Sequence, residues 1–337
     1  MFVTLALSLA VISCLDRGTA PAGRADAVAD SLPDTVYHKI PKVEIVIERA
    51  LLFEKYALAD TFPYRDTVRV IQWDKITRSL EMFDSMLLRP TAWCVLGNRH
   101  NRNGIAPMAR VVHPNDYKNV SDAFGVERRN AIPLYLSADS LAPECYTQDG
   151  SLARLFSPPG DSLAVVEPLH IGGRWTVPSQ YVRHIVADTL DPMAQPAFDH
   201  AIFVDRHNQY IVTLQRESPK WLVRSVNPCT TGRRLPPYQY QTPRGVFAIQ
   251  EKKKEMIFLK DGTTDVREGF APFASRFSNG GYIHGVPVNY PRTETIEWSW
   301  TLGTTPRSHM CVRNATSHAE FIFNWAPTLQ TAVFIFE

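Results

Sequence analysis

Prolines and turn-forming residues recur throughout this 337-residue chain and divide it into short segments. The short distance between them limits the folds that the chain can adopt. The sequence holds 25 prolines against 17 glycines, together with 12 tyrosines and 7 tryptophans. Proline fixes φ and removes a backbone donor, so it ends helices, whereas aromatic residues favour strands. The length and composition therefore predict a mainly β, multi-domain protein, and they exclude collagen, coiled coils and solenoid repeats.

The N-terminus begins with an apolar run that predicts a targeting segment. Residues 2–13 (FVTLALSLAVIS) are too few to span a bilayer as a helix and have signal-peptide length. The run ends in VISC, which resembles a bacterial lipobox, so we expect residues 1–14 to be a signal peptide and Cys14 to be lipidated. No Lys or Arg precedes the run, and the alternative is an apolar strand that buries Cys14. Residues 15–36 are small and polar, which predicts a flexible tether and an exported, lipid-anchored protein of the cell envelope or periplasm.

The charge balance gives no reason to expect a nucleic-acid partner. Lys plus Arg number 36 and Asp plus Glu 34, so the formal net charge is +2, too small for the field that nucleic-acid binding requires. Export implies an oxidising compartment, where cysteines are disulfide candidates as well as free thiols. Four cysteines follow Cys14, at wide spacings: Cys94, Cys145, Cys229 and Cys311. Their number permits two disulfides without deciding between the two states.

Changes in composition divide the rest of the chain into units. Residues 37–124 mix apolar and charged runs, including one amphipathic helical pattern, and predict a small α+β domain. Residues 125–187 alternate short β runs with turns, as in a small SH3-like barrel that touches glycopeptide or serves as a spacer. Residues 188–198 hold two prolines and predict a linker. Residues 199–337 predict a β-rich domain whose one late helix begins at a capping box in residues 317–320.

The last unit carries short motifs in an order that can build a thiol site. Before the late helix they are TTG (230–232) with TPRGVFAI (242–249), then GGYIHG (280–285) and SHMCVR (308–313). A thiolate is a competent nucleophile, and a nearby imidazole can generate it at neutral pH, so the pattern indicates cysteine acyl transfer. A zinc site built from His284, His309 and Cys311 is chemically feasible, but the chain offers no fourth ligand cluster.

These motifs resemble the L,D-transpeptidase catalytic domain, the YkuD-type family of peptidoglycan cysteine transferases, over about residues 199–337. The resemblance implies that Cys311 is the nucleophile, that His284 is the base and that His309 shapes the site. It also implies oxyanion or supporting positions at Met310, Ser308 and Gly285, and substrate-binding positions at Arg313, Tyr282 and Phe273. Arginine suits a carboxylate because its guanidinium can donate two parallel hydrogen bonds. No cofactor and no metal is implied.

The sequence departs from the family pattern at three places. Met310 stands where the family has glycine; we expect an ordinary negative φ there, so that its N–H serves as well as that of glycine, whereas a positive φ would strain methionine. Residues 285–307 are longer than is usual and are expected to form a flap or hairpin over the cleft, where donor specificity would reside. Phe273 stands where the family often has a tyrosine that assists at the oxyanion, so that hydroxyl is absent.

The function implied by the resemblance is that of a monomeric peptidoglycan L,D-transpeptidase. Cys311 would attack the carbonyl that precedes the terminal D-Ala of a tetrapeptide stem and expel D-Ala, and an amine of another stem would then take the thioester to form a crosslink. With water as the acceptor the same site is an L,D-carboxypeptidase. The alternative from another class is a catalytically inactive wall-binding lipoprotein whose oxyanion hole Met310 has impaired. Carbapenems acylate the family, so Cys311 is expected to be their target.

Overall fold

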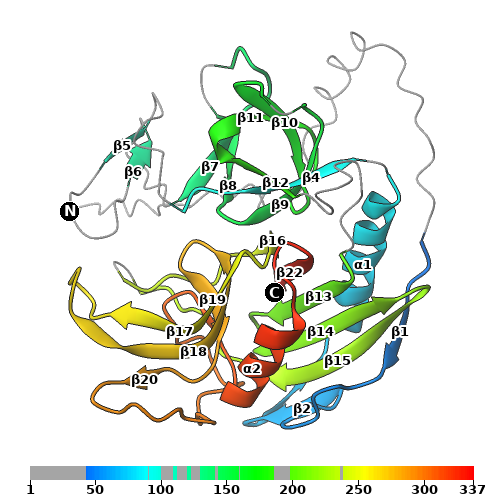
Figure 1. Ribbon diagram of the computed structural model, residues 1–337. Helices are drawn as coiled ribbons and strands as arrows, with labels where there is room; N and C mark the ends of the chain where they lie inside the picture. The colour runs from blue at the N-terminus through cyan, green and yellow to red at the C-terminus, as the bar shows by residue number, and fades with distance from the viewer. Residues whose placement is uncertain are drawn as a thin grey trace, which may run out of the picture.

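The structure is a computed structural model that describes residues 43–89, 91–99, 109–111, 120–122, 130–140, 143–158, 160–185, 198–235 and 238–337. The predicted signal peptide, Cys14, the tether and nearly all of the predicted linker lie outside these residues. The described chain is mainly β and contains two α-helices (Figure 1), which confirms the predicted fold class. None of its helices is long and apolar enough to cross a bilayer.

An 11-stranded sheet forms the centre of the fold (Figure 1). Its main path contains, in spatial order, β1 (Val46–Arg49), β15 (Lys220–Pro228), β14 (Tyr210–Glu217), β13 (His200–Asp205), β22 (Thr331–Phe336), β16 (Gly245–Ala248), β9 (Ser151–Leu155), β10 (Leu163–Pro168) and β11 (Trp175–Pro178). Two further strands branch from β9, namely β4 (Ala92–Leu96) and then β12 (Val182–Ile185). The C-terminal strand β22 runs parallel to β13 and antiparallel to β16.

A second sheet of five strands lies beside the first (Figure 1). Its strands are β17 (Glu251–Leu259), β18 (Arg267–Ser278), β19 (Gly281–His284) and β21 (Val312–Arg313) in spatial order, with β20 (Val288–Asn289) also paired to β18. The helix α2 (Thr316–Trp325) follows β21 and contacts β18 and β19. The remaining elements are the pairs β2 (Thr61–Tyr64) with β3 (Thr67–Val70), β5 (Ala109–Val111) with β6 (Val120–Asp122) and β7 (Ala131–Leu134) with β8 (Cys145–Gln148), and the 3₁₀ turn η3 (Ser179–Tyr181).

Both faces of the central strands are buried, because alternate side chains of a strand enter different cores. Ile202 of β13 packs in a core with Ile283 of β19 and Val312 of β21. Its neighbour Phe203 joins the opposite core, together with Phe83 of the helix α1 (Trp73–Leu87). The first of these cores therefore fixes β19 and β21, the two strands that border the predicted nucleophile and base.

The described part of the predicted N-terminal domain (residues 37–124) shares a core with the 11-stranded sheet. The strand β1 pairs in parallel with β15 and lengthens that sheet. The predicted helix is present as α1, and Ile76, Leu80 and Phe83 bury its apolar face against the sheet. The strand β4 instead pairs with β9 of the following unit. These described elements thus extend the 11-stranded sheet and its branch at β9 and do not form a body with a core of its own.

The unit predicted at residues 125–187 is antiparallel and shares a core with β4. That core includes Leu96 of β4 together with Leu134, Val166 and Tyr181. The hairpin of β7 and β8 joins β11 through a bridge between Tyr135 and Thr176. No closed barrel occurs among the described residues, so the SH3-like architecture stays a prediction.

The predicted capping box at residues 317–320 is wrong. The helix α2 begins at Thr316, after Ala315, and no side-chain cap comes from within the box. Ser317 lies inside the first turn, where its backbone N–H donates to Glu297 Oε2 at 3.0 Å and its hydroxyl donates to Oε1 at 2.6 Å. A carboxylate from the preceding loop therefore satisfies the free N–H group and the positive end of the helix, a partner that local spacing does not reveal.

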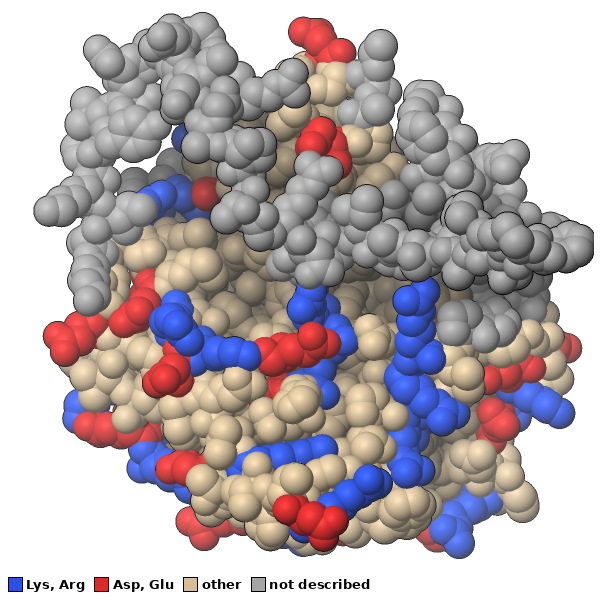
Figure 2. All heavy atoms as spheres, turned by 180° about the vertical axis from the view of Figure 1, so that it is seen from behind, with Lys and Arg blue, Asp and Glu red and all other residues tan. Residues whose placement is uncertain are grey.

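Charged side chains of both signs are interspersed on the face that Figure 2 shows, where one band of Lys and Arg lies to the right of centre. Exposed pairs such as Arg49 with Asp60 and Lys220 with Glu48 follow the same mixed pattern. The surface thus lacks, on that face, the continuous basic field typical of a nucleic-acid binder.

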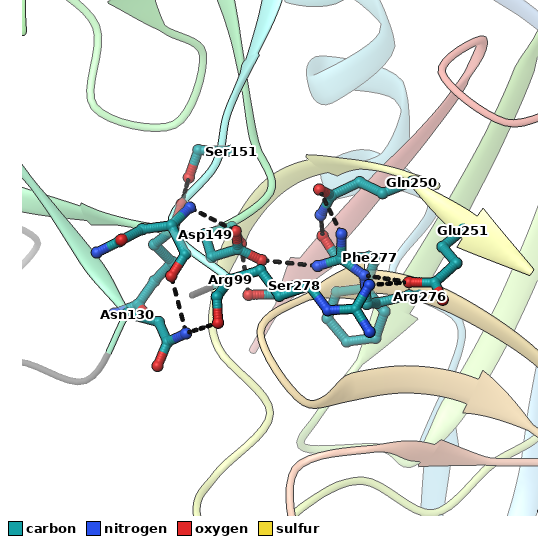
Figure 3. Close-up of polar contacts among 11 residues, drawn as sticks. Arg99, Asn130, Asp149, Ser151, Gln250, Glu251, Arg276, Phe277 and Ser278 are labelled. Atoms are coloured by element: carbon teal, nitrogen blue, oxygen red, sulfur yellow. Dashed lines mark hydrogen bonds and ion pairs between the residues drawn. The ribbon is translucent and has the colours of Figure 1, made fainter. Parts of the chain in front are cut away.

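A buried ion pair joins the unit at residues 130–185 to the second sheet (Figure 3). Arg276 of β18 donates through Nη1 to Asp149 Oδ2 at 2.9 Å, and both side chains are almost fully buried. Arg276 also donates to Gln250 Oε1 at 2.9 Å. The hydroxyl of Ser278 donates to the backbone oxygen of Asp149 at 2.6 Å. Each nitrogen of the Arg276 guanidinium thus has an acceptor, and these hydrogen bonds offset the free-energy cost of removing the ion pair from water.

Glycine is required beside this ion pair. Gly150 has φ of 91°, and a Cβ atom there would lie 1.9 Å from the backbone oxygen of Phe277. The backbone of the turn between β8 and β9 therefore packs directly against the backbone at the end of β18, which leaves no room for a side chain. The predicted base His284 lies on β19. The turn from β18 into β19 is therefore held by contacts from Asp149 and Gly150, which lie outside the second sheet.

We expect Asp149→Ala to destabilise the protein strongly, because it leaves the Arg276 guanidinium buried without its carboxylate. Removal of one partner of a buried pair costs about 3–5 kcal/mol in the free energy of unfolding. The matched control is Glu48→Ala, which breaks the exposed pair with Lys220 and should cost below about 1 kcal/mol. Denaturant unfolding of both variants measures the difference. Equal losses in the two variants would show that the buried pair does not hold the two units together.

Candidate active site

Cys311 lies immediately before β21, in a small buried cluster with Ala274 and Tyr282. Its Sγ lies 3.3 Å from the backbone oxygen of Gly280, to which the thiol donates. Burial raises the pKa of the thiol, while the backbone N–H of Tyr282 and the charge of Arg313 act in the opposite direction. The resting group is therefore a neutral thiol that needs a base before it can react.

His284 lies on β19, which runs parallel to β21 with Ile283 opposite Val312 and His284 opposite Arg313. This register places Cys311 level with Tyr282, two residues before His284 along the neighbouring strand. Because alternate residues share a face, His284 and Cys311 belong to the same face of the sheet. The structure thus places the predicted base and the predicted nucleophile on one face of adjacent chain segments, although a long segment separates them in the sequence.

The hydrogen bond of the His284 ring determines its tautomer. Nδ1 lies 2.6 Å from the backbone oxygen of Gly285, and a carbonyl oxygen only accepts, so Nδ1 carries the hydrogen. In the neutral ring Nε2 then holds a free lone pair. Burial, together with the charge of Arg313, lowers the pKa of His284 to about 4, so the ring is neutral at physiological pH. A neutral imidazole with an unprotonated Nε2 can take the thiol proton.

Met310 has φ of 137°, so the expectation of an ordinary negative φ is wrong. The backbone of Met310 is tightly packed, since a Cβ atom on Gly232 would lie 2.7 Å from its Cα. Its N–H points to Ser308 Oγ at 3.5 Å, and its backbone oxygen accepts from Thr242 Oγ1 at 2.7 Å. These contacts hold the loop in the conformation that glycine adopts freely, and methionine is strained there.

Side chains from two of the motifs hold the backbone around the nucleophile. Ser308 Oγ donates to the backbone oxygen of Cys311 at 2.5 Å, which supports the predicted supporting role. Thr242 accepts the N–H of Gly232 at 2.8 Å as it donates to Met310. Thr242 of the Thr-Pro motif therefore holds the cysteine loop against Gly232. Thr242 and Gly280 both lie within the sequence motifs, but the motif pattern alone gives neither residue a role.

Gly285 is packed too closely for any side chain. A Cβ atom there would lie 2.8 Å from both Pro272 and the Thr316 hydroxyl, and its N–H donates to the backbone oxygen of Pro272 at 2.9 Å. Its N–H is thus engaged, whereas its carbonyl sets the His284 tautomer. Tyr282, by contrast, is buried in contact with Cys311, and burial raises the pKa of its hydroxyl.

Two of the predicted site residues point elsewhere. His309 is half exposed, and its Nε2 lies 3.0 Å from Asp261 Oδ2 in the turn between β17 and β18. The ring of Phe273 lies 5.9 Å from that of Phe323 on α2. The shaping role of His309 and the substrate contact of Phe273 stay predictions.

The long segment at residues 285–307 forms the wall of a cavity of about 340 Å³. Val286, Trp298, Trp300 and Leu302 contribute to its lining, and Arg313 joins them from β21. The segment contains the short strand β20 and a bridge between Val286 and Ile296 rather than a regular hairpin. It therefore places a cavity next to Arg313, the residue that pairs with the predicted base His284.

The described cysteines Cys94, Cys145, Cys229 and Cys311 are all free and buried. No group of three or more His, Cys, Asp or Glu side chains in the described chain is arranged to hold a metal ion. His284 and His309 have separate partners, Gly285 and Asp261.

A comparison with protein-family models tests the family assignment expected from the motifs. Residues 199–335 match the family model of YkuD, the L,D-transpeptidase catalytic domain. The family predicted from the motifs is confirmed for this segment. The match begins at the end of the predicted linker and stops two residues before the C-terminus, so it contains both strands of the site and the whole cavity wall.

Three solved structures are similar to the chain at low identity. A fused Zn-dependent amidase/peptidase/peptidoglycan-binding domain-containing protein from Clostridium acetobutylicum is 18% identical over 41% of this chain and 52% of its own, with a TM-score of 0.30. An L,D-transpeptidase from Mycobacterium tuberculosis is 17% identical over 56% and 92%, with a TM-score of 0.33. L,D-transpeptidase 3 from the same organism, in complex with a faropenem-derived adduct, is 16% identical over 58% and 72%, with a TM-score of 0.31.

The chain thus spans about half the length of the Clostridium protein, with 52% covered. No curated protein matches it. Because these TM-scores are low, the assignment rests on the YkuD match and on the motifs.

We expect Met310→Gly to stabilise the protein, since it removes a side chain from a backbone conformation that favours glycine. The strain is of order 1–3 kcal/mol, and the extra freedom of glycine in the unfolded chain offsets about 0.5–1 kcal/mol of the gain. Denaturant unfolding measures the free energy, and Met310→Ala is the control, because alanine keeps the strained Cβ but loses the long side chain. A variant Met310→Gly no more stable than Met310→Ala would mean that the loop relaxes.

Proposed function

We propose that this protein is a peptidoglycan L,D-transpeptidase that acts through a Cys311 thioester, with His284 as its base. The observation that carries the proposal is the neutral His284 ring, whose unprotonated Nε2 lies on the same sheet face as the Cys311 thiol. The YkuD match supports peptidoglycan as the substrate class. The exported, lipid-anchored and monomeric state predicted from the sequence belongs to the same proposal.

The first half of the reaction forms the thioester. As Sγ of Cys311 attacks the carbonyl carbon before the terminal D-Ala, its proton passes to Nε2 of His284. Backbone N–H groups of the cysteine loop stabilise the oxygen that becomes negative. The tetrahedral intermediate then breaks its C–N bond, and the imidazolium gives the proton to the departing amine. Burial disfavours a charged His284, so the imidazolium readily releases that proton.

The second half releases the acyl group. The amine of an acceptor stem attacks the thioester carbon, His284 takes the amine proton, and the C–S bond breaks to return the thiol. With water in place of the amine the product is a shortened stem, which makes the enzyme an L,D-carboxypeptidase. The cavity beside Arg313 is open to either acceptor.

A second candidate function is an inactive wall-binding protein, and one observation favours it. Met310 strains the loop that must supply the oxyanion donors, and its own N–H is turned toward Ser308. Such a protein would hold glycopeptide in the cavity without forming a covalent bond.

We expect a carbapenem to acylate the protein at Cys311, with intact mass increased by one drug molecule. Cys311→Ala should show no adduct, whereas Cys229→Ala should react as the wild type does, because Cys229 is buried in the core between the sheets. The same samples, incubated with tetrapeptide donor and an acceptor stem, should release D-Ala and form a crosslink. No adduct and no D-Ala release from the folded wild type would favour the inactive wall-binding protein.

The rate of this acylation should fall as the pH drops through about 4. Only the neutral ring accepts the thiol proton, and burial keeps His284 neutral well below the ordinary histidine pKa, so the rate should be level between roughly pH 5.5 and 7.5. Stopped-flow acylation across pH 3.5–8 measures the profile, with circular dichroism to confirm folding at each pH. A lower limb centred near the ordinary histidine value of about 6.5 would show that a solvated imidazole is the base.

A further inference from the structure

The Arg313 guanidinium is a positive charge that the described chain leaves without an anion. Arg313 is partly buried at the end of β21, its Nε is buried without a hydrogen-bond partner, and no carboxylate of the described chain forms an ion pair with it. Other buried or partly buried arginines do have such partners: Arg154 with Glu167, Arg206 with Glu337, Arg216 with Asp84, Arg224 with Glu217 and Arg276 with Asp149. A desolvated charge is costly when unpaired, so this position is prepared for an anionic ligand.

Arg313 stands between the reacting atoms and the cavity. It lies opposite His284 in the register and two residues after Cys311, which corresponds to about 6–7 Å of extended chain. It also lines the cavity of about 340 Å³, whose other walls include Trp298 and Trp300. An anion bound there would lie next to the carbonyl that Cys311 attacks, with an apolar space behind it.

The wall of this cavity is held in place by the N-terminal segment, which lies outside the YkuD match. Arg69 of β3 donates to the backbone oxygens of Gly303 at 2.5 Å and of Thr304 at 2.7 Å. Lys55 forms an ion pair with Glu297 at 2.8 Å.

The ring of Tyr56 lies 4.3 Å from that of Trp298, one of the cavity residues. The cavity is thus held before any ligand enters, which lowers the entropy cost of binding.

We propose that Arg313 binds the terminal carboxylate of the acyl donor, and that the cavity holds the side chain of that terminal residue. This inference rests on the proposed function. In a donor whose attacked carbonyl is followed by one last residue, the carboxylate carbon is three bonds from the carbonyl carbon, which suits a guanidinium adjacent to Cys311. A planar guanidinium can bind such a carboxylate with two parallel hydrogen bonds. Arg313 is then a specificity-determining residue, which selects donors that end directly after the reacting bond.

The decisive experiment compares two donors that differ in one group: a tetrapeptide that ends in D-Ala with a free carboxylate, and the same peptide as its C-terminal carboxamide. For the wild type, kcat/KM of D-Ala or D-Ala-amide release should be at least about tenfold higher with the carboxylate, as expected for a charge-assisted pair. Arg313→Gln should remove this preference, and Arg313→Lys should restore part of it. The matched control is Arg292→Gln, which removes an exposed charge from the cavity-wall segment at residues 285–307. This variant should keep the preference for the carboxylate donor.

Two further measurements separate this role from others. Alkylation by neutral iodoacetamide reports the reactivity of the Cys311 thiol without any carboxylate ligand. Because the charge of Arg313 favours the thiolate, the alkylation rate should fall in Arg313→Gln, but by less than the loss of kcat/KM with the carboxylate donor. Binding to Cys311→Ala, followed by the fluorescence of the cavity tryptophans, should be at least about tenfold tighter for the carboxylate peptide than for the amide.

The outcomes are distinguishable. Equal turnover of the two donors by the wild type would overturn the inference and leave the transpeptidase function intact. A matching loss of iodoacetamide reactivity and of turnover of both donors in Arg313→Gln would show that Arg313 acts on the thiol instead. No turnover of either donor would reject the proposed function, whereas the binding preference in Cys311→Ala would still decide whether Arg313 is a carboxylate receptor.

Discussion

The site depends on one short parallel pairing, between β19 and β21. Two residue pairs, Ile283 with Val312 and His284 with Arg313, align the segment that carries the proposed base with the segment that carries the proposed nucleophile. So short a ladder is not stable alone. It persists because Ile283 and Val312 are buried in the core between the two sheets, where Ile202 packs against them. The hydrophobic core thus sets the register, and the register sets which polar side chains meet.

Burial gives the two reacting groups their protonation states. Desolvation raises the pKa of Cys311 and lowers that of His284, so both are neutral at rest, and the proposed reaction has to move a proton rather than begin from an ion pair. Arg313 adds to this balance from the neighbouring position, because its charge disfavours the imidazolium and favours the thiolate. An anionic ligand on Arg313 would weaken both effects and so make the protonated His284 easier to form, which is what the attack requires.

The sequence predicted those features that depend on a local pattern of residues. It did not predict features that depend on backbone packing or on a side chain distant in the sequence. The strands from β13 to β15, the final strand β22 and the helix α1 follow from period and turn residues, and Cys311 and His284 follow from motifs. The start of α2 was predicted to within one residue, but its capping partner was not, because Glu297 comes from a loop with no regular period. The expected negative φ of Met310 was wrong. Residues 312 and 313 match the family pattern, but they carry no information on Gly232 and Thr242, whose contacts hold the Met310 backbone.

The N-terminal part of the chain shows why a catalytic domain of this kind cannot be understood from its own segment alone. Arg69, Lys55 and Tyr56 precede the YkuD match, yet they contact the loop that forms the cavity wall. At the other end, Asp149 binds Arg276 and so holds the turn that leads to Gly280 and His284. A long loop such as residues 285–307 costs more entropy to order than a short one. The flanking segments supply contacts that offset this cost, so they and this loop form one structural unit.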